Sequence, residues 1–174
     1  MLRLTKTGML FLCSIATLLS CQERQVVKAD YQVIPMPREI VADNQSAFKL
    51  TSATTIHFPA ENAQMENVAN FLAGYIETST GNKLKVSSTE SAQAISLVID
   101  ESISNKEGYE LTVSADGVRI AGSTPAGVFY GVQTLRKSIP ATGGKKDVEL
   151  AAVKISDYPR FSYRGMMLDV SRHF

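Results

Sequence analysis

Apolar residues recur at helical spacing in two segments of the chain, the first of which is residues 62–78. Apolar side chains fall every three or four positions there, and Gly81 follows them as a stop signal. The stripe consists of Met65, Val68, Ala69, Leu72 and Ile76. We therefore predict an amphipathic helix over residues 62–78 that packs this stripe against a core.

The second helix is predicted to begin just after Thr124. The Thr124 side chain can accept hydrogen bonds from the first turn, and Pro125 suits the first helical position, where no N–H is needed. The apolar stripe is Val128, Val132, Leu135 and Ile139. Gly127 and Gly131 lie four positions apart within this helix, although glycine costs about 1 kcal/mol relative to alanine in a helix interior. The pair therefore predicts that a neighbouring element approaches the helix closely.

Short segments rich in β-branched and aromatic residues predict strands. They lie within residues 49–58, 84–86 and 95–99. Residues 109–113 alternate between apolar and polar, and the apolar pattern resumes after Asp116 and Gly117. Asp-Gly favours a hairpin turn because glycine permits positive φ. The predicted fold is therefore α+β, an antiparallel or mixed sheet with two helices packed on one face.

The first twenty residues have the pattern of an export signal. Arg3 and Lys6 precede an apolar run over residues 9–19 that is too short to span a bilayer. The run leads into the letters LLSC, which resemble the lipobox of bacterial lipoproteins, whose cysteine is lipidated. We predict a lipoprotein signal peptide over residues 1–20 and lipidation of Cys21; a plain secretory peptide cleaved nearby is the alternative.

Lipidation would make the protein an exported bacterial lipoprotein, anchored to a membrane and facing the periplasm or the cell surface. Residues 22–30 are polar and show neither helical nor strand periodicity. We therefore assign residues 21–30 to a tether and residues 31–156 to the folded α+β domain.

Composition excludes several classes of function. The 174 residues include 18 Lys+Arg and 17 Asp+Glu, so the net charge of +1 leaves no basic excess for nucleic acid. Two cysteines and two histidines are too few for a zinc finger or a disulfide scaffold. The chain has no P-loop, no Gly-x-Ser-x-Gly and no metal-ligand spacing, so we predict no cofactor and no metal.

Several segments carry a resemblance to a known family. Residues 33–37 (VIPMP), 107–113 (EGYELTV), 120–122 (IAG) and 126–135 (AGVFYGVQTL) are similar to the accessory α+β domain of family 20 glycoside hydrolases, the β-N-acetylhexosaminidases. Residues 157–174 (DYPRFSYRGMMLDVSRHF) resemble the beginning of the catalytic (β/α)₈ barrel in the same family. We therefore expect residues 157–174 to form the first strand of that barrel.

The resemblance implies an exo-acting β-N-acetylhexosaminidase that removes terminal GlcNAc or GalNAc from glycans. The family uses a retaining, substrate-assisted mechanism in which the substrate's 2-acetamido carbonyl attacks the anomeric carbon. A glutamate protonates the leaving oxygen, and the aspartate before it orients the acetamide. This Asp-Glu pair lies downstream of the Arg-His segment in the family, so no acid of this chain is assigned to catalysis.

The same resemblance implies a substrate-binding residue. Arg164 matches the arginine of an Arg-Gly motif that holds ring hydroxyls of the terminal sugar, and its planar fork of donors suits that task. A structural arginine paired with an acid is the alternative for Arg164. Asp169, Arg172 and His173 match an Asp-x-x-Arg-His pattern, and we expect them to form a salt-bridged network that supports the site; direct contact with the substrate is the alternative.

A (β/α)₈ barrel needs about 250 residues, so we expect the chain to be the N-terminal part of a longer enzyme and to be inactive by itself. The competing hypothesis takes the 174 residues as complete. The protein would then be a non-catalytic surface lipoprotein whose α+β domain serves as a binding or scaffolding module. Whether the reading frame continues past Phe174 separates the two hypotheses.

Overall fold

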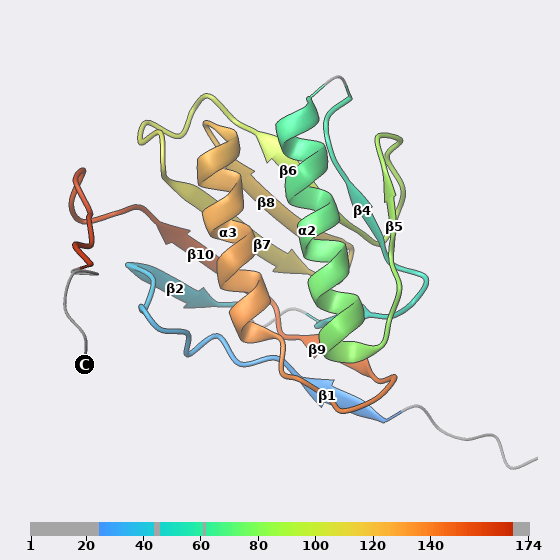
Figure 1. Ribbon diagram of the computed structural model, residues 1–174. Coiled ribbons are helices and arrows are strands. Elements are labelled where there is room, and N and C mark those ends of the chain that lie inside the picture. Colours follow the sequence, from blue (N-terminus) through green and yellow to red (C-terminus); the bar gives the residue numbers. More distant parts are fainter. Residues whose placement is uncertain (1–24, 44–45, 61, 169–174) are drawn as a thin grey trace, which may run out of the picture.

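Two helices, α2 (Ala63–Thr80) and α3 (Pro125–Ser138), lie side by side on one face of a seven-stranded sheet in the computed structural model (Figure 1). The structure describes residues 25–43, 46–60 and 62–168. The strands of this sheet are β2 (Glu39–Ala42), β4 (Thr55–His57), β5 (Lys85–Ser87), β6 (Ala94–Ile99), β7 (Tyr109–Ser114), β8 (Gly117–Gly122) and β10 (Val153–Asp157). The predicted α+β arrangement of a sheet with two helices on one face is confirmed.

The sheet is mixed. Its strand order is β2-β10-β7-β8-β6-β4-β5. Pairing is antiparallel from β2 to β8, where the predicted hairpin joins β7 to β8, and parallel from β8 to β5. The hairpin register sets Leu111 opposite Ile120, so both point toward the helices and are fully buried.

A second, three-stranded sheet closes one end of the domain (Figure 1). Its strands are β1 (Val26–Lys28), β9 (Asp147–Leu150) and β3 (Phe48–Leu50), in the order β1-β9-β3. Residues 26–28 were expected to lie in the tether, and the structure corrects this: they pair in parallel with β9. The Lys28 ammonium lies 3.4 Å from a Glu149 carboxylate oxygen, and Val27 packs against the core. Residues 26–28 thus form a strand because they pair with β9, although their own sequence has no strand periodicity.

Helix α2 confirms the first sequence prediction and continues to Thr80. The Asn62 side chain accepts a hydrogen bond from the Met65 N–H at 3.1 Å and so caps the first turn. Gly81 ends the helix with φ of +69°, and its N–H donates to the Glu77 carbonyl at 2.9 Å. The predicted apolar stripe is buried against the sheet and α3.

Helix α3 approaches the sheet through its two glycines, as predicted. A Cβ at Gly127 would lie 2.3 Å from the carbonyl oxygen of Gly108, and one at Gly131 would lie 2.5 Å from Ile120 Cγ2. Neither position leaves room for a methyl group. The first of these contacts is made to backbone, so relief there requires the chain itself to move.

The core lies between the helices and the seven-stranded sheet. Its largest fully buried side chains are Phe48, Leu50, Ile56, Met65, Leu72, Ile76, Ile95, Leu97, Leu111, Ile120, Leu135 and Ile139. No helix in the described part of the chain is long and apolar enough to cross a membrane.

The described part of the C-terminal segment, residues 158–168, contains neither helix nor strand. The strand expected to open a barrel is therefore not formed there. A lone strand leaves a row of backbone donors and acceptors without partners, and it needs neighbouring strands to form. The segment exposes large apolar side chains, with Met167 97% exposed and Tyr163 88% exposed.

Candidate functional site

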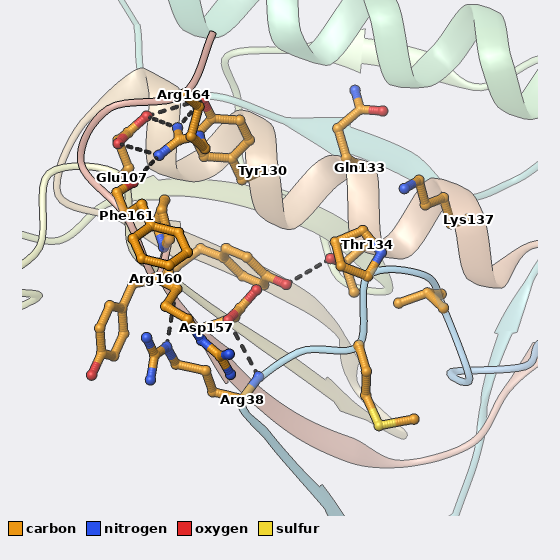
Figure 2. Close-up of a pocket in the computed structure, with 16 residues that line it drawn as sticks. Arg38, Glu107, Tyr130, Gln133, Thr134, Lys137, Asp157, Arg160, Phe161 and Arg164 are labelled. Atoms are coloured by element: carbon orange, nitrogen blue, oxygen red, sulfur yellow. Dashed lines mark hydrogen bonds and ion pairs between the residues drawn. The ribbon is translucent and has the colours of Figure 1, made fainter. Parts of the chain in front are cut away.

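A hollow of about 650 Å³ lies beside α3, where β10 leaves the sheet (Figure 2). Three parts of the chain build its walls: residues 33–38 on one side, Tyr130, Gln133, Thr134 and Lys137 of α3 on another, and residues 157–164 on the third. Glu107 and Tyr109 complete the lining. The hollow therefore lies where the accessory-type sequence motifs meet the C-terminal segment.

Tyr109 and Thr134 meet inside the hollow. Their hydroxyl oxygens are 2.6 Å apart, within hydrogen-bonding distance. Burial raises the pKa of the Tyr109 phenol to about 12, and the nearby Asp157 carboxylate adds to this effect, although the bond with Thr134 opposes it. Tyr109 is therefore a neutral phenol at physiological pH and serves as a hydrogen-bonding group.

Two cations fasten the segment of residues 33–38 to the rest of the domain. The Arg38 guanidinium lies 4.0 Å from the centre of the Tyr158 ring, and its Nε donates to the Tyr158 carbonyl at 3.1 Å. The Arg38 backbone N–H donates to the Asp157 carboxylate at 3.2 Å. Lys137 of α3 donates to the Ile34 carbonyl at 2.6 Å. These contacts fix one wall of the hollow.

Arg164 and Glu107 form a bidentate ion pair at the rim (Figure 2). The Arg164 Nη2 lies 2.6 Å from Glu107 Oε1, and Nη1 lies 3.3 Å from Oε2. Nη1 also donates to the Phe161 carbonyl at 2.7 Å. The Tyr130 hydroxyl donates to Glu107 Oε1 at 3.1 Å and lies 3.4 Å from Arg164 Nη2.

The ion pair shifts the pKa values of both partners. Hydrogen bonds from Arg164 lower the pKa of Glu107, against a weaker desolvation effect, and Tyr130 lowers it further. The hydrogen bond with Glu107 in turn raises the pKa of Arg164. Both groups are charged at neutral pH, so Glu107 is a carboxylate that accepts hydrogen bonds.

The structure places one of the sequence-predicted site residues. Arg164 is paired with an acid, as in the structural alternative considered for it, and its contact with a sugar stays a prediction. Asp169, Arg172, His173 and the lipidation candidate Cys21 lie outside the described residues.

Sequence reasoning assigned neither Glu107 nor Tyr130 to the site. Glu107 opens the EGYELTV motif, which was the signal available for it, but its partner Arg164 lies 57 positions further along the chain. In the described part of the chain, no group of three or more His, Cys, Asp or Glu side chains is arranged to hold a metal ion.

Comparisons with known proteins all point to one family. Residues 30–158 match the model of "Glycosyl hydrolase family 20, domain 2". A β-hexosaminidase of Porphyromonas gingivalis is 33% identical over 177 residues, which cover 94% of this chain and 22% of the relative. A β-hexosaminidase of Vibrio vulnificus is 34% identical over 82% of this chain and 15% of the relative.

Solved structures agree with the sequence comparisons. The family 20 β-N-acetylhexosaminidase of Streptomyces coelicolor superimposes with a TM-score of 0.67 and 32% sequence identity. The match covers 82% of this chain and 29% of the Streptomyces chain. The chain thus spans less than a third of the length of the relatives described here.

Proposed function

This chain belongs to glycosyl hydrolase family 20, and on that premise we propose that its α+β domain is the accessory domain of a β-N-acetylhexosaminidase. The match of residues 30–158 to the family's domain 2 is the observation that carries the proposal. The shared fold with the Streptomyces coelicolor enzyme at 32% identity supports it. The relatives are several times longer, so we propose that a catalytic barrel supplies the rest of the enzyme.

The proposed substrate is a glycan or glycoconjugate with a terminal, non-reducing N-acetylhexosamine. In the substrate-assisted mechanism, the acetamido carbonyl of the substrate displaces the leaving oxygen while a carboxylic acid protonates that oxygen. A general acid needs a pKa near the working pH. The pKa of Glu107 is lowered and that of Tyr109 is raised to about 12, so neither group suits the task. The resemblance to family 20 implies a catalytic Asp-Glu pair downstream of the Arg-His segment, and we place that pair in the barrel region.

Arg164 is the residue of this chain that we propose to bind the sugar. Its Nη atoms engage Glu107, Phe161 and Tyr130, while Nε forms no hydrogen bond within the described residues. The Nε–H is therefore the guanidinium donor that remains for a ring hydroxyl of the sugar. Asp169, Arg172 and His173 are proposed to form a salt-bridged network that supports the site from the following segment.

We also propose that the enzyme is exported and anchored to a membrane through a lipid on Cys21, facing the periplasm or the cell surface. The apolar run ending in the LLSC letters supports this location. No nucleic-acid partner is proposed, because the chain has no basic excess.

The deciding experiment measures the intact mass and the activity of the native protein from its producing cell. We expect a polypeptide of several hundred residues that hydrolyses a fluorogenic N-acetyl-β-glucosaminide and leaves the corresponding β-glucoside, which lacks the acetamide, intact. A lipidated product that ends at Phe174 and hydrolyses neither compound would refute the hydrolase proposal and favour the binding-module hypothesis.

Arg164→Ala tests the residue assignment within that enzyme. We expect kcat/KM to fall by about two orders of magnitude, because charge-assisted bonds to the sugar are lost. Arg119→Ala is the matched control, since Arg119 is also an exposed arginine paired with an acid, Asp100, but does not line the hollow. Equal kcat/KM values for the two variants would remove Arg164 from the site.

A further inference from the structure

We infer that Glu107, assisted by Tyr130, is a positioning residue for the guanidinium of Arg164. The inference rests on the proposed sugar-binding role of Arg164 and adds to it a residue of the accessory domain that acts on the sugar site. It follows from the bidentate contact, from the way the fold fixes Glu107, and from the edge of Arg164 that this contact leaves open.

The contact between Glu107 and Arg164 fixes both the direction and the plane of the guanidinium. Each Nη atom faces a different carboxylate oxygen, at 2.6 Å and 3.3 Å, so the fork cannot rotate without breaking one bond. The Phe161 carbonyl holds Nη1 from the other side at 2.7 Å. Both bonds to Glu107 come from the far end of the fork. Nη2 also donates to the Tyr130 hydroxyl at 3.4 Å, so the Nε–H is the donor that is left to face a ligand.

The loop that carries Glu107 is anchored to the start of α3. The Glu107 N–H donates to the Asn105 side chain at 2.9 Å, and the Asn105 carbonyl accepts from the Ser123 hydroxyl at 3.0 Å. The Thr124 hydroxyl donates to the Lys106 carbonyl at 2.5 Å. Asn105 and Lys106 are thus tied to the segment that caps α3, and the backbone of Glu107 is held in turn by the Asn105 side chain.

Glycine at position 127 brings α3 and the loop together. The Gly108 carbonyl lies so close to Gly127 that a Cβ there would be 2.3 Å from its oxygen. Tyr130 follows three residues later on α3, and its hydroxyl reaches Glu107 Oε1 at 3.1 Å (Figure 2). Helix α3 therefore fixes the position of the loop through backbone contact at Gly127, and it fixes the Glu107 carboxylate through the Tyr130 side chain.

The degree of exposure argues against stability as the main role of this ion pair. The Arg164 side chain is 45% exposed and that of Glu107 is 33% exposed. Ion pairs this open to water contribute little to the free energy of unfolding, because solvent screens them. What the arrangement does provide is a defined orientation for a long, otherwise mobile cation.

The first test asks whether the contact exists in solution. The side-chain carboxyl carbon of Glu107 is titrated by ¹³C NMR in the chain itself, in Arg164→Ala and in the control Arg119→Ala. We expect the pKa of Glu107 to lie below the usual glutamate range, to rise toward that range in Arg164→Ala, and to stay unchanged in Arg119→Ala. An identical Glu107 pKa in all three proteins would overturn the inference.

The second test asks whether the contact positions Arg164 for substrate. In the full-length enzyme, Glu107→Gln keeps the shape of the side chain but removes its charge and one acceptor. We expect KM for the N-acetylhexosaminide to rise about tenfold with a smaller change in kcat. Glu107→Asp, which keeps the charge, should recover part of the loss.

Glu110→Gln is the matched control for this second test. The Glu110 side chain is exposed on the face of β7 opposite to the buried Tyr109. Its substitution removes the same charge as Glu107→Gln and should leave KM and kcat unchanged. Equal KM values for Glu107→Gln and Glu110→Gln, with unchanged circular dichroism spectra, would overturn the positioning role.

The two tests separate the failure of this inference from the failure of the proposed function. A wild-type enzyme that hydrolyses no N-acetylhexosaminide would refute the proposed function and, with it, the role of Glu107 toward a sugar. An active enzyme with an unshifted Glu107 pKa, or with an unaffected KM in Glu107→Gln, would refute the inference and leave the proposed function standing.

Discussion

Gly127→Ala should destabilise the domain, although alanine is the better helix former. The added Cβ would lie 2.3 Å from the Gly108 carbonyl oxygen and 3.3 Å from its carbonyl carbon. Ordinary van der Waals contact begins at 3.4 Å, so the loop or the helix must move by about 1 Å. Because the obstacle is backbone, no side-chain rotation relieves it.

The magnitude follows from two opposing terms. Overpacking a filled site costs about 1–3 kcal/mol, while replacing glycine by alanine in a helix returns at most about 1 kcal/mol. We therefore expect the free energy of unfolding to fall by about 1–2 kcal/mol. Gly74→Ala in α2 is the control, since no atom lies within 4 Å of its Cβ position. That variant should gain about 0.5–1 kcal/mol.

Urea unfolding followed by far-UV circular dichroism measures both changes. The two variants should differ by about 1.5–3 kcal/mol in the free energy of unfolding, with the same dependence on urea concentration as the wild type. In a thermal scan the same difference corresponds to about 3–12 °C for a domain of this size. A Gly127→Ala protein as stable as Gly74→Ala would refute the argument that α3 and the loop of residues 105–108 are in forced contact.

Three further predictions concern the fold. Hydrogen bonds from Ser102, together with a nearby guanidinium, lower the pKa of Asp100 from 3.8 to about 2. The contribution of Asp100 to stability is therefore present above pH 4 and is lost as the pH falls toward 2. In urea titrations, the free energy of unfolding of Asp100→Asn should lie below that of the wild type at pH 6 and converge with it below pH 2. Asn62→Ala removes the acceptor that caps α2 and should cost about 1 kcal/mol in urea unfolding, and an unchanged midpoint would contradict the capping role. Leu97→Ala empties a fully buried site and should cost about 2–5 kcal/mol, whereas Leu168→Ala, 71% exposed, should change stability by less than about 0.5 kcal/mol; equal thermal midpoints would contradict this core.

The sequence predicted those elements whose signals are local. Helix α2 has a cap, a stripe and a stop within residues 62–81, and the hairpin of β7 and β8 has its turn between two alternating segments. β1 carries no such signal, because it is held by pairing with β9, which lies far along the chain and itself pairs with β3 on its other side. A three-residue strand such as Val26–Lys28 therefore reads as a polar tether until its partner is known.

The sequence predicted Arg164 as a site residue but did not predict its partner Glu107. Arg164 stands in a motif that implies sugar binding, and the accessory-domain motif contains Glu107, but nothing in the spacing relates two residues 57 positions apart. Their contact depends on where β10 delivers the C-terminal segment and on how closely α3 approaches Gly108. Both are results of packing, which is not encoded in any single stretch of sequence.

The close approach of α3 to the loop of residues 105–108 therefore contributes both to the packing of the core and to the geometry of the proposed site. At Gly127 the absence of a side chain lets α3 settle against the loop of residues 105–108, and the same helix turn brings Tyr130 to the Glu107 carboxylate. The core strands β7 and β8 lie under this helix, so the position of Glu107 is determined by the same packing that stabilises the domain. If Arg164 binds the sugar, its orientation is set by the core of the accessory domain, although Arg164 itself lies in the exposed segment beyond that core. If the catalytic acid lies in the barrel region, as proposed, the accessory domain would in this way still take part in substrate recognition.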